Sequence, residues 1–235
     1  MLLSIFGDSI MAGVVQENGR YSRCREQFQR LEQETGARLD NHSSFGSTVV
    51  KGFGRLKKFL EQGQLGEYTL VEFGGNDCAY NWAEVAAAPD GQHICVVPPE
   101  EFEKNYEQII MAVQAAGSRP VAATLPPISS GRYLQHICRD GLDSGAILHW
   151  LGDLEAISRW QAAYSAMVSR VAARLGCRVL DLRSAFPAAG PELEQYLCQD
   201  GIHPNRLGQK LMYEKAVLPA LAMLKKSIYS RKCFL

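Results

Sequence analysis

The sequence predicts an α/β protein in which a parallel β-sheet is covered by helices. Short apolar runs alternate along the chain with longer segments whose apolar residues recur at helical spacing, which is the pattern of repeated strand–helix units. At 235 residues, 46% of them hydrophobic, the chain is large enough to bury one core and does not need a second domain. No repeat, low-complexity tract or shift in composition marks a boundary, so we expect a single domain over residues 1–235.

Five strands are expected, and each is a short apolar run. They cover residues 2–6, 38–42, 69–73, 120–125 and 178–182, of which 38–42 carries the weakest pattern. Helices are expected in the intervals because apolar residues recur there with a helical period. They cover about 21–34, 50–61, 102–113, 157–175 and 206–224. Pro219 lacks the N–H that a helix interior needs, so we expect it to kink or break the last helix.

Two stretches between these elements are too long for ordinary connections. Residues 78–100 and 126–154 are expected to be insertions that act as lids or binding loops, or are disordered. Three large aromatic residues fall in them, namely Trp82, Tyr133 and Trp150. Such side chains either line a substrate pocket or pin the insertions to the body of the protein, and the sequence favours neither.

Charge and cysteine content argue against several classes of protein. Lysine plus arginine number 25 and aspartate plus glutamate also number 25, so no basic field would attract nucleic acid or an anionic membrane. The seven cysteines include no C-x-x-C pair, which disfavours a disulfide scaffold and a zinc ribbon. No apolar run approaches the roughly 20 residues of a membrane span. The first residues lack the basic region of a signal peptide, so we expect a cytoplasmic protein.

Residues whose groups can take part in catalysis follow four of the expected strands. In an open parallel sheet, ligands bind beyond the carboxyl ends of the strands. Ser9 follows the first strand, Gly46 the second and Asn76 the third. Asp200 and His203 come after the last strand. We therefore expect a hydroxyl, an amide, a carboxylate and an imidazole to meet at one edge of the sheet.

This set of groups is the one that acyl transfer requires. A serine hydroxyl becomes an effective nucleophile when an imidazole takes its proton, and a carboxylate fixes the tautomer of that imidazole. Asp200 and His203 are three residues apart, so a single tight turn can present both side chains. The developing oxyanion also needs fixed donors. Candidates are the backbone N–H groups of Ser9 and Gly46 and the side-chain amide of Asn76.

At these residues the sequence resembles the GDSL, or SGNH, hydrolase family. Four blocks define that family, and they are marked by serine, glycine, asparagine and histidine. They occur here in order as Ser9 in GDSI, Gly46, Asn76 in GGND and His203 in DGIHPN. An isoleucine replaces the leucine of the family's name. Each short motif is weak alone, whereas four in order, each after a strand, are a strong signal.

The resemblance implies a three-layer α/β/α sandwich with a five-stranded parallel sheet of flavodoxin-like type. It implies Ser9 as nucleophile, His203 as base and Asp200 as its partner, with an oxyanion hole from Ser9, Gly46 and Asn76. It requires no metal and no cofactor. Gly52 and Gly54 are alternatives to Gly46, which we prefer because it follows the second strand most directly. The G-x-S-x-G motif of the α/β-hydrolase fold is absent, which disfavours that fold.

Several polar residues near the strand ends have structural interpretations. Asp8 is expected to cap a helix or to bond nearby backbone. Asp77 is expected to brace the turn that carries Asn76, and Asp181 to orient its neighbours. His42 is expected to be a structural histidine rather than a substrate contact.

Two further features of the second insertion have open interpretations. His136, Cys138 and Asp140 together suggest a metal site only weakly, because no second cluster stands at ligand spacing. Arg132 either grips an anionic group of a substrate or is solvated.

The sequence therefore predicts a serine hydrolase that acts through an acyl-enzyme intermediate. Its expected substrates are carboxylic esters of small molecules or sugars with short-chain acyl or acetyl groups. A lysophospholipase or thioesterase type of acylhydrolase is an alternative. From a different class, a binding module with a vestigial triad stays open. No residue pattern sets the oligomeric state, since an apolar helix face serves a core and an interface equally.

Overall fold

The computed structural model describes residues 1–224 and contains one five-stranded parallel sheet with the strand order β4-β1-β5-β6-β7. The strands are β1 (Leu2–Gly7), β4 (Arg38–Asn41), β5 (Tyr68–Glu72), β6 (Arg119–Ala123) and β7 (Arg178–Leu180). All five expected strands are present, including the weakest. This order is the flavodoxin-like one, so the expected fold class is confirmed. Residues 225–235, the end of the expected single domain, lie outside the described residues.

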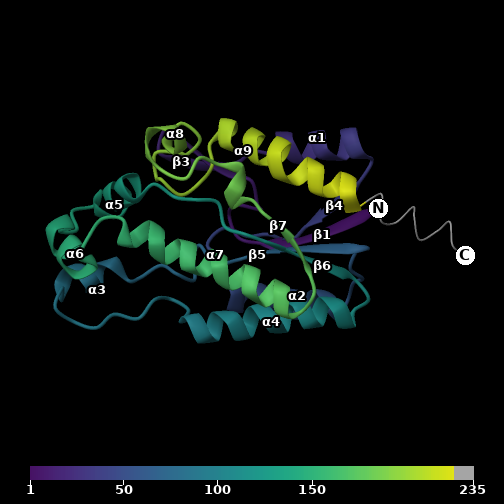
Figure 1. The fold of residues 1–235 in the computed structure, drawn as a ribbon, viewed down its shortest axis with the longest axis horizontal. Helices are drawn as coiled ribbons and strands as arrows, with labels where there is room; N and C mark the ends of the chain where they lie inside the picture. Colours follow the sequence, from purple (N-terminus) through teal and green to yellow (C-terminus); the bar gives the residue numbers. More distant parts are fainter. Residues whose placement is uncertain (225–235) are drawn as a thin grey trace, which may run out of the picture.

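Helices cover both faces of the sheet and complete three layers (Figure 1). One face carries α2 (Val49–Leu60), α4 (Pro99–Ala115) and α7 (Ala156–Arg174), and the other carries α1 (Glu26–Thr35) and α9 (Arg206–Met212). Side chains of a strand alternate between the two faces. Phe6 and Val71 accordingly pack in the core under α2, α4 and α7, whereas their neighbours Ile5 and Leu70 pack under α1 and α9.

The first helix is shorter than expected because a β-hairpin takes its place. β2 (Val14–Glu17) and β3 (Arg20–Arg23) pair antiparallel, and α1 begins only at Glu26. The two residues of the turn, Asn18 and Gly19, have φ angles of 51° and 73°. Positive φ at both positions is what a type I′ hairpin turn needs, and Asn-Gly is its preferred pair. The expected helix over 21–34 is therefore wrong at its start.

The last helix spans the expected residues 206–224, with an irregular turn before Pro219. After α9 comes a π-helical turn, η2 (Tyr213–Val217), and the helix then continues to Leu224. The N–H of Leu218 bonds the carbonyl of Tyr213, five residues earlier. A π-helical turn shifts the hydrogen-bonding register of a helix, and here it lies immediately before Pro219, the residue with no N–H to donate. Pro219 thus follows a widened turn and does not break the helix.

The insertions form short helices that lie together beyond the carboxyl ends of the strands (Figure 1). The first contains α3 (Trp82–Ala87), and the second contains α5 (Ser130–Cys138) and α6 (Ser144–Leu151). They share a small core of their own, formed by Val85, Ile128, Leu134, Ile147 and Ile157. We call this group of three helices the cap. Between β7 and α9 lie a 3₁₀ turn, η1 (Arg183–Ala185), and α8 (Gly190–Glu194). Within residues 1–224, no helix has the length and apolar character of a membrane span.

Candidate active site

The candidate site lies at the carboxyl ends of β1 and β5. Ser9 follows β1 and Asn76 follows β5, and the two strands are neighbours in the sheet. The chain leaves β1 toward β4 on one side, whereas β5 is followed by β6 on the other. Such a reversal of strand order opens a crevice at the carboxyl ends of an α/β sheet. The fold therefore places the expected nucleophile at the point where a ligand has room.

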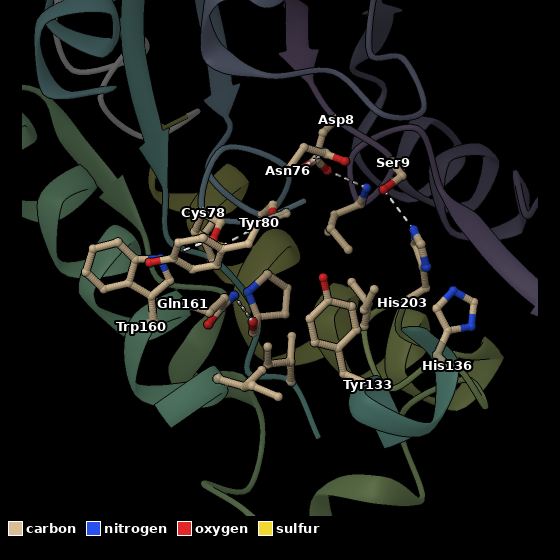
Figure 2. Close-up of a pocket in the computed structure, with 18 of the residues that line it drawn as sticks. Asp8, Ser9, Asn76, Cys78, Tyr80, Tyr133, His136, Trp160, Gln161 and His203 are labelled. Carbon is tan, nitrogen blue, oxygen red and sulfur yellow. Dashed lines mark hydrogen bonds between the residues drawn. The ribbon is translucent and has the colours of Figure 1, made fainter. Parts of the chain in front are cut away.

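A continuous chain of hydrogen bonds joins Ser9, His203 and Asp200, and Figure 2 shows the bond between Ser9 and His203. The Oγ atom of Ser9 lies 2.8 Å from Nε2 of His203, and Nδ1 of His203 lies 2.7 Å from Oδ2 of Asp200. All three residues are buried. The second carboxylate oxygen of Asp200, Oδ1, accepts the backbone N–H groups of Ile202 and His203 at 2.9 and 3.0 Å. This geometry directs the unprotonated Nε2 of a neutral imidazole at the serine hydroxyl.

The surroundings of Asp200 keep it ionised. Burial acts to raise the pKa of this carboxyl, but the hydrogen bond from His203 and those from the two backbone N–H groups lower it. The balance leaves the pKa of Asp200 below its usual value. A carboxylate that stays charged can hold the proton of His203 on Nδ1.

The turn that carries Asp200 and His203 depends on the glycine between them. Gly201 has φ of 73°, a conformation that residues with a Cβ rarely adopt. A Cβ at this position would also lie 2.7 Å from the Cβ of Arg132 and 2.8 Å from the carbonyl oxygen of Ser129. The backbone of Ser129 in turn bonds the Gly201 carbonyl. Close contact with the start of α5 thus fixes the turn.

Arg132 neither grips a substrate anion nor stands free in solvent. Its guanidinium donates to the carbonyl oxygens of Glu194 and Leu197 at 2.7 and 3.1 Å, so it ties α5 to the segment before Asp200. The structure therefore gives Arg132 a structural role that neither interpretation drawn from the sequence had described. The residue supports the loop of the triad because its planar fork can satisfy several carbonyl groups at once.

The three expected oxyanion donors lie on the loops after β1, β4 and β5. The Nδ2 group of Asn76 donates to Oδ2 of Asp8 at 3.1 Å and to the carbonyl oxygen of Ser47 at 3.2 Å. The bond to Ser47 holds Asn76 against the loop that contains Gly46. Among residues 1–224, neither Ser9 nor Gly46 donates its backbone N–H to a protein acceptor. Both N–H groups are thus available to a ligand.

The alternative glycine Gly52 has a packing role. It is buried in α2, and a Cβ there would lie 2.2 Å from the ring of Phe73. Gly54 lies further along the same helix, with open space around it. Neither is on the loop that follows β4.

Three buried acids lie beside Asn76, and one of them was not anticipated. Asp8 accepts the backbone N–H of Ile10 at 2.8 Å, and Asp77 accepts that of Val49 at 2.8 Å, which agrees with their expected structural roles. Glu72, at the end of β5, is fully buried beside Asp8. Burial raises the pKa of Asp77 to about 7 and holds the pKa of Glu72 well above its usual value. The signal that could have revealed Glu72 is an acid inside an otherwise apolar strand.

Two aromatic residues cover His203, and neither was anticipated. The ring of Tyr21 meets the imidazole edge to face at 5.4 Å, and the ring of Phe45 stacks on it at 5.9 Å. Tyr21 lies on the hairpin and Phe45 on the loop after β4. The Asn-Gly turn was the available signal, because it predicts a hairpin that carries Tyr21 to the site.

A cavity of about 390 Å³ extends from Ser9 toward the cap. Trp82, Tyr133 and Trp150 all line it, so the expected pocket role holds for each. They also hold the cap together, because Nε1 of Trp82 donates to the hydroxyl of Tyr133 at 3.1 Å. The pocket role therefore applies to all three side chains, and the bond between Trp82 and Tyr133 ties the two insertions to each other.

Other features singled out from the sequence take no part in the hydrogen-bonded chain of Ser9, His203 and Asp200. His42 packs between Phe6 and Phe59, with ring centroids 4.9 and 4.5 Å away, as expected of a structural histidine. Asp181 accepts the hydroxyls of Thr124 and Ser184. No group of three or more potential metal ligands occurs in the part of the chain that the structure describes.

Comparison with known proteins identifies the family. The model of the GDSL-like lipase/acylhydrolase family matches residues 5–211. No curated protein sequence gives a significant match. A lipase/acylhydrolase from Enterococcus faecalis has a similar fold, with a TM-score of 0.61, 20% identity and coverage of 98% of this chain and 96% of that one.

Two further solved structures share the fold at low identity. An acylhydrolase from Bacteroides fragilis, described as putative, gives a TM-score of 0.64 at 14% identity, covering 95% of this chain and 87% of that one. The psychrotrophic esterase EstA from Pseudoalteromonas gives 0.58 at 17% identity, covering 97% and 98%. The matched family segment contains the serine, asparagine, aspartate and histidine positions described above. This chain belongs to the GDSL-like lipase/acylhydrolase family and is an ester-hydrolysing enzyme of that family.

Proposed function

We propose that this enzyme cleaves carboxylic esters through an acyl-enzyme intermediate, with Ser9 as nucleophile, His203 as general base and Asp200 as the partner of His203. One observation carries the proposal. The hydroxyl, imidazole and carboxylate form an unbroken hydrogen-bonded chain with separations of 2.8 and 2.7 Å. Those separations fall within the reach required for proton transfer from a nucleophile to its base.

The steps follow from the order of the hydrogen bonds. As Oγ of Ser9 attacks the ester carbon, its proton passes to Nε2 of His203. The imidazolium keeps its other proton on Nδ1, where the charge of Asp200 stabilises it. His203 then gives the first proton to the leaving alcohol oxygen, and the acyl group stays on Ser9. His203 then takes a proton from water, which attacks the acyl carbon. The bond between that carbon and Oγ of Ser9 breaks, the acid leaves, and His203 returns the proton to Oγ.

The negative charge on the former carbonyl oxygen needs donors in both tetrahedral intermediates. We assign them to the backbone N–H groups of Ser9 and Gly46 and to the amide of Asn76. The amide bonds Ser47 at 3.2 Å, a long hydrogen bond to a neutral acceptor. An oxyanion is a stronger acceptor, because hydrogen bonds to ionised groups are about twice as strong as neutral ones. We therefore expect the oxyanion to take one N–H of Asn76 from Ser47.

Small esters suit the site better than long-chain lipids. The cavity of about 390 Å³ is at the lower end of the range for small-molecule sites, roughly 300 to 1,000 Å³. We therefore propose short or compact acyl groups, on small alcohols or sugars, as substrates. In a panel of esters and thioesters that differ in acyl length, a lysophospholipase would prefer a long acyl chain and a thioesterase would prefer a thioester. Ester cleavage is proposed ahead of simple binding because every group that the chemistry needs is present.

The test uses the intact protein and its Ser9→Ala variant. The wild-type protein should react with a fluorophosphonate probe and hydrolyse p-nitrophenyl acetate, and Ser9→Ala should do neither. EstA of Pseudoalteromonas is described as inhibited by monoethylphosphonate, which motivates the choice of a phosphonate probe. His203→Ala should also fail to hydrolyse p-nitrophenyl acetate. An unlabelled, inactive wild-type protein would favour the binding module, and an active Ser9→Ala protein would refute the role of Ser9.

A further inference from the structure

The walls of the active-site cavity are aromatic, and their indole donors are already used. Nε1 of Trp150 donates to the carbonyl of Gly91 at 3.2 Å, and Nε1 of Trp160 donates to the carbonyl of Cys78 at 3.1 Å. Trp82 donates to a tyrosine of the cap, as described above. These side chains therefore present apolar ring surface to the cavity. Such walls favour an apolar or aromatic group on the ligand.

Polar groups interrupt this apolar surface, and the hydroxyl of Tyr133 is one of them. Figure 2 shows the hydroxyl of Tyr133 pointing into the cavity, and Tyr133 is one of its lining residues. Its oxygen accepts the N–H of Trp82 at 3.1 Å. Its own proton is donated to no acceptor within residues 1–224. Burial raises the pKa of Tyr133 to about 12, so the hydroxyl keeps that proton at neutral pH.

The arrangement fixes Tyr133 as a donor. A phenolic oxygen that already accepts from a neighbour is oriented by that bond, and its remaining capacity is a single O–H donor. A donor that faces an apolar cavity without an acceptor is costly unless a ligand supplies one. The ligand group that complements Tyr133 and the aromatic walls is therefore apolar over most of its surface and carries an oxygen acceptor for this hydroxyl.

The acyl part of the substrate is the part that reaches this donor. The leaving alcohol oxygen must come within hydrogen-bond reach of Nε2 of His203, which receives and returns the proton. In Figure 2, Tyr80, Trp160 and Gln161 lie on the side of Ser9 away from His203, and Tyr133 stands between that side and His203. The alcohol thus lies toward His203, and the acyl group extends into the cavity under the cap.

Resting on the proposed function, we infer that the preferred substrates are esters of compact aryl-bearing acids whose ring carries an acceptor oxygen, and that Tyr133 selects them by donating to that oxygen. An engineered apolar cavity of about 150 Å³ is large enough to bind benzene. The present cavity of about 390 Å³ therefore has room for one ring, its substituent and the chain that links it to the carbonyl.

The experiment compares two p-nitrophenyl esters of similar shape. One has a 3-(4-methoxyphenyl)propanoyl group and the other a 3-(4-ethylphenyl)propanoyl group, so an ether oxygen in the first replaces a methylene in the second. The two-carbon spacer insulates the reacting carbonyl from the substituent. Wild-type protein should show a kcat/KM for the methoxy ester that is higher by roughly threefold to tenfold, which is the effect of one net hydrogen bond. In Tyr133→Phe this ratio should fall to about one.

A matched control removes a tyrosine hydroxyl elsewhere. Tyr213 bonds Glu34 on the opposite face of the sheet, at 2.7 Å, and Tyr213→Phe should keep the wild-type ratio. A wild-type ratio near one, or a preference that survives in Tyr133→Phe, would overturn the inference. The wild-type ratio decides the matter even if Tyr133→Phe does not fold.

Failure of the proposed function would look different. If p-nitrophenyl acetate is cleaved through Ser9 but the two aryl esters are cleaved equally well, only the role of Tyr133 is lost. If no ester is cleaved and Ser9 resists the fluorophosphonate probe, the proposed function fails and this inference fails with it.

Discussion

Replacing Asp200 by asparagine should silence the enzyme while leaving its fold intact. The structure decides which way the new amide would face. With its oxygen at the position of Oδ1, the amide still accepts the N–H groups of Ile202 and His203, and its NH₂ group faces Nδ1 of His203. The opposite orientation leaves two buried N–H groups without an acceptor, at about 1–3 kcal/mol each. The first orientation is therefore favoured.

That orientation selects the wrong tautomer of the histidine. An NH₂ group facing Nδ1 makes this nitrogen an acceptor, so the ring proton moves to Nε2. Nε2 then cannot accept the proton of Ser9, which lies 2.8 Å away. The equivalent exchange in a serine protease triad lowers kcat about 10⁴-fold. We expect a loss of the same order here, which corresponds to about 5 kcal/mol of activation free energy.

The assay is kcat/KM for p-nitrophenyl acetate, combined with the melting temperature of each variant. Asp181→Asn is the matched control, because it makes the same substitution at the same end of the sheet, where Asp181 contacts Thr124 and Ser184. It should leave kcat/KM close to the wild-type value. Activity of Asp200→Asn within about tenfold of wild type, with Ser9→Ala inactive, would refute the tautomer argument.

Three other predictions concern the oxyanion donors, the turn of the triad and the buried acids. Asn76→Ala should lower kcat about 10²- to 10³-fold, and an unchanged kcat in steady-state kinetics would remove Asn76 from the oxyanion hole. Gly201→Ala should lower both the melting temperature and the activity, because φ of 73° and a contact of 2.7 Å leave no room for a Cβ; a wild-type melting curve would contradict this. Asp77 has a pKa of about 7 when folded, so between pH 4 and 7 the unfolded chain releases a proton that the folded protein keeps. Stability should therefore fall as pH rises through this interval, and the decline should be smaller in Asp77→Asn, as measured by urea unfolding at several pH values.

The sequence predicts best those elements that are determined by residues close together in the chain. Buried parallel strands need continuous apolar runs, and even the weak run at 38–42 forms β4. The triad residues could be located because they follow strands and match four blocks of a known family. The hairpin was missed although its signal is also local, since Asn18 and Gly19 favour a type I′ turn.

The features that were missed depend on contacts between distant segments. Nothing near Glu72 in the chain reveals that Asp8 lies beside it, 64 residues away. Arg132 could not be assigned to the loop of the triad, because its acceptors lie more than 60 residues along the chain. The stacking of Phe45 on His203 likewise requires the assembled sheet. The sequence locates the groups that react, and the fold determines how they are held.

The separation of 194 residues between Ser9 and His203 also bears on how the enzyme is made. During synthesis the serine emerges among the earliest residues, whereas the histidine is added only after all five strands of the sheet have been synthesised. A nascent or interrupted chain therefore carries an ordinary, unreactive alcohol. Ester hydrolysis would therefore report that the fold is completely assembled. Proteolytic cleavage that lets the segment after β1 separate from the segment after β7 would abolish it.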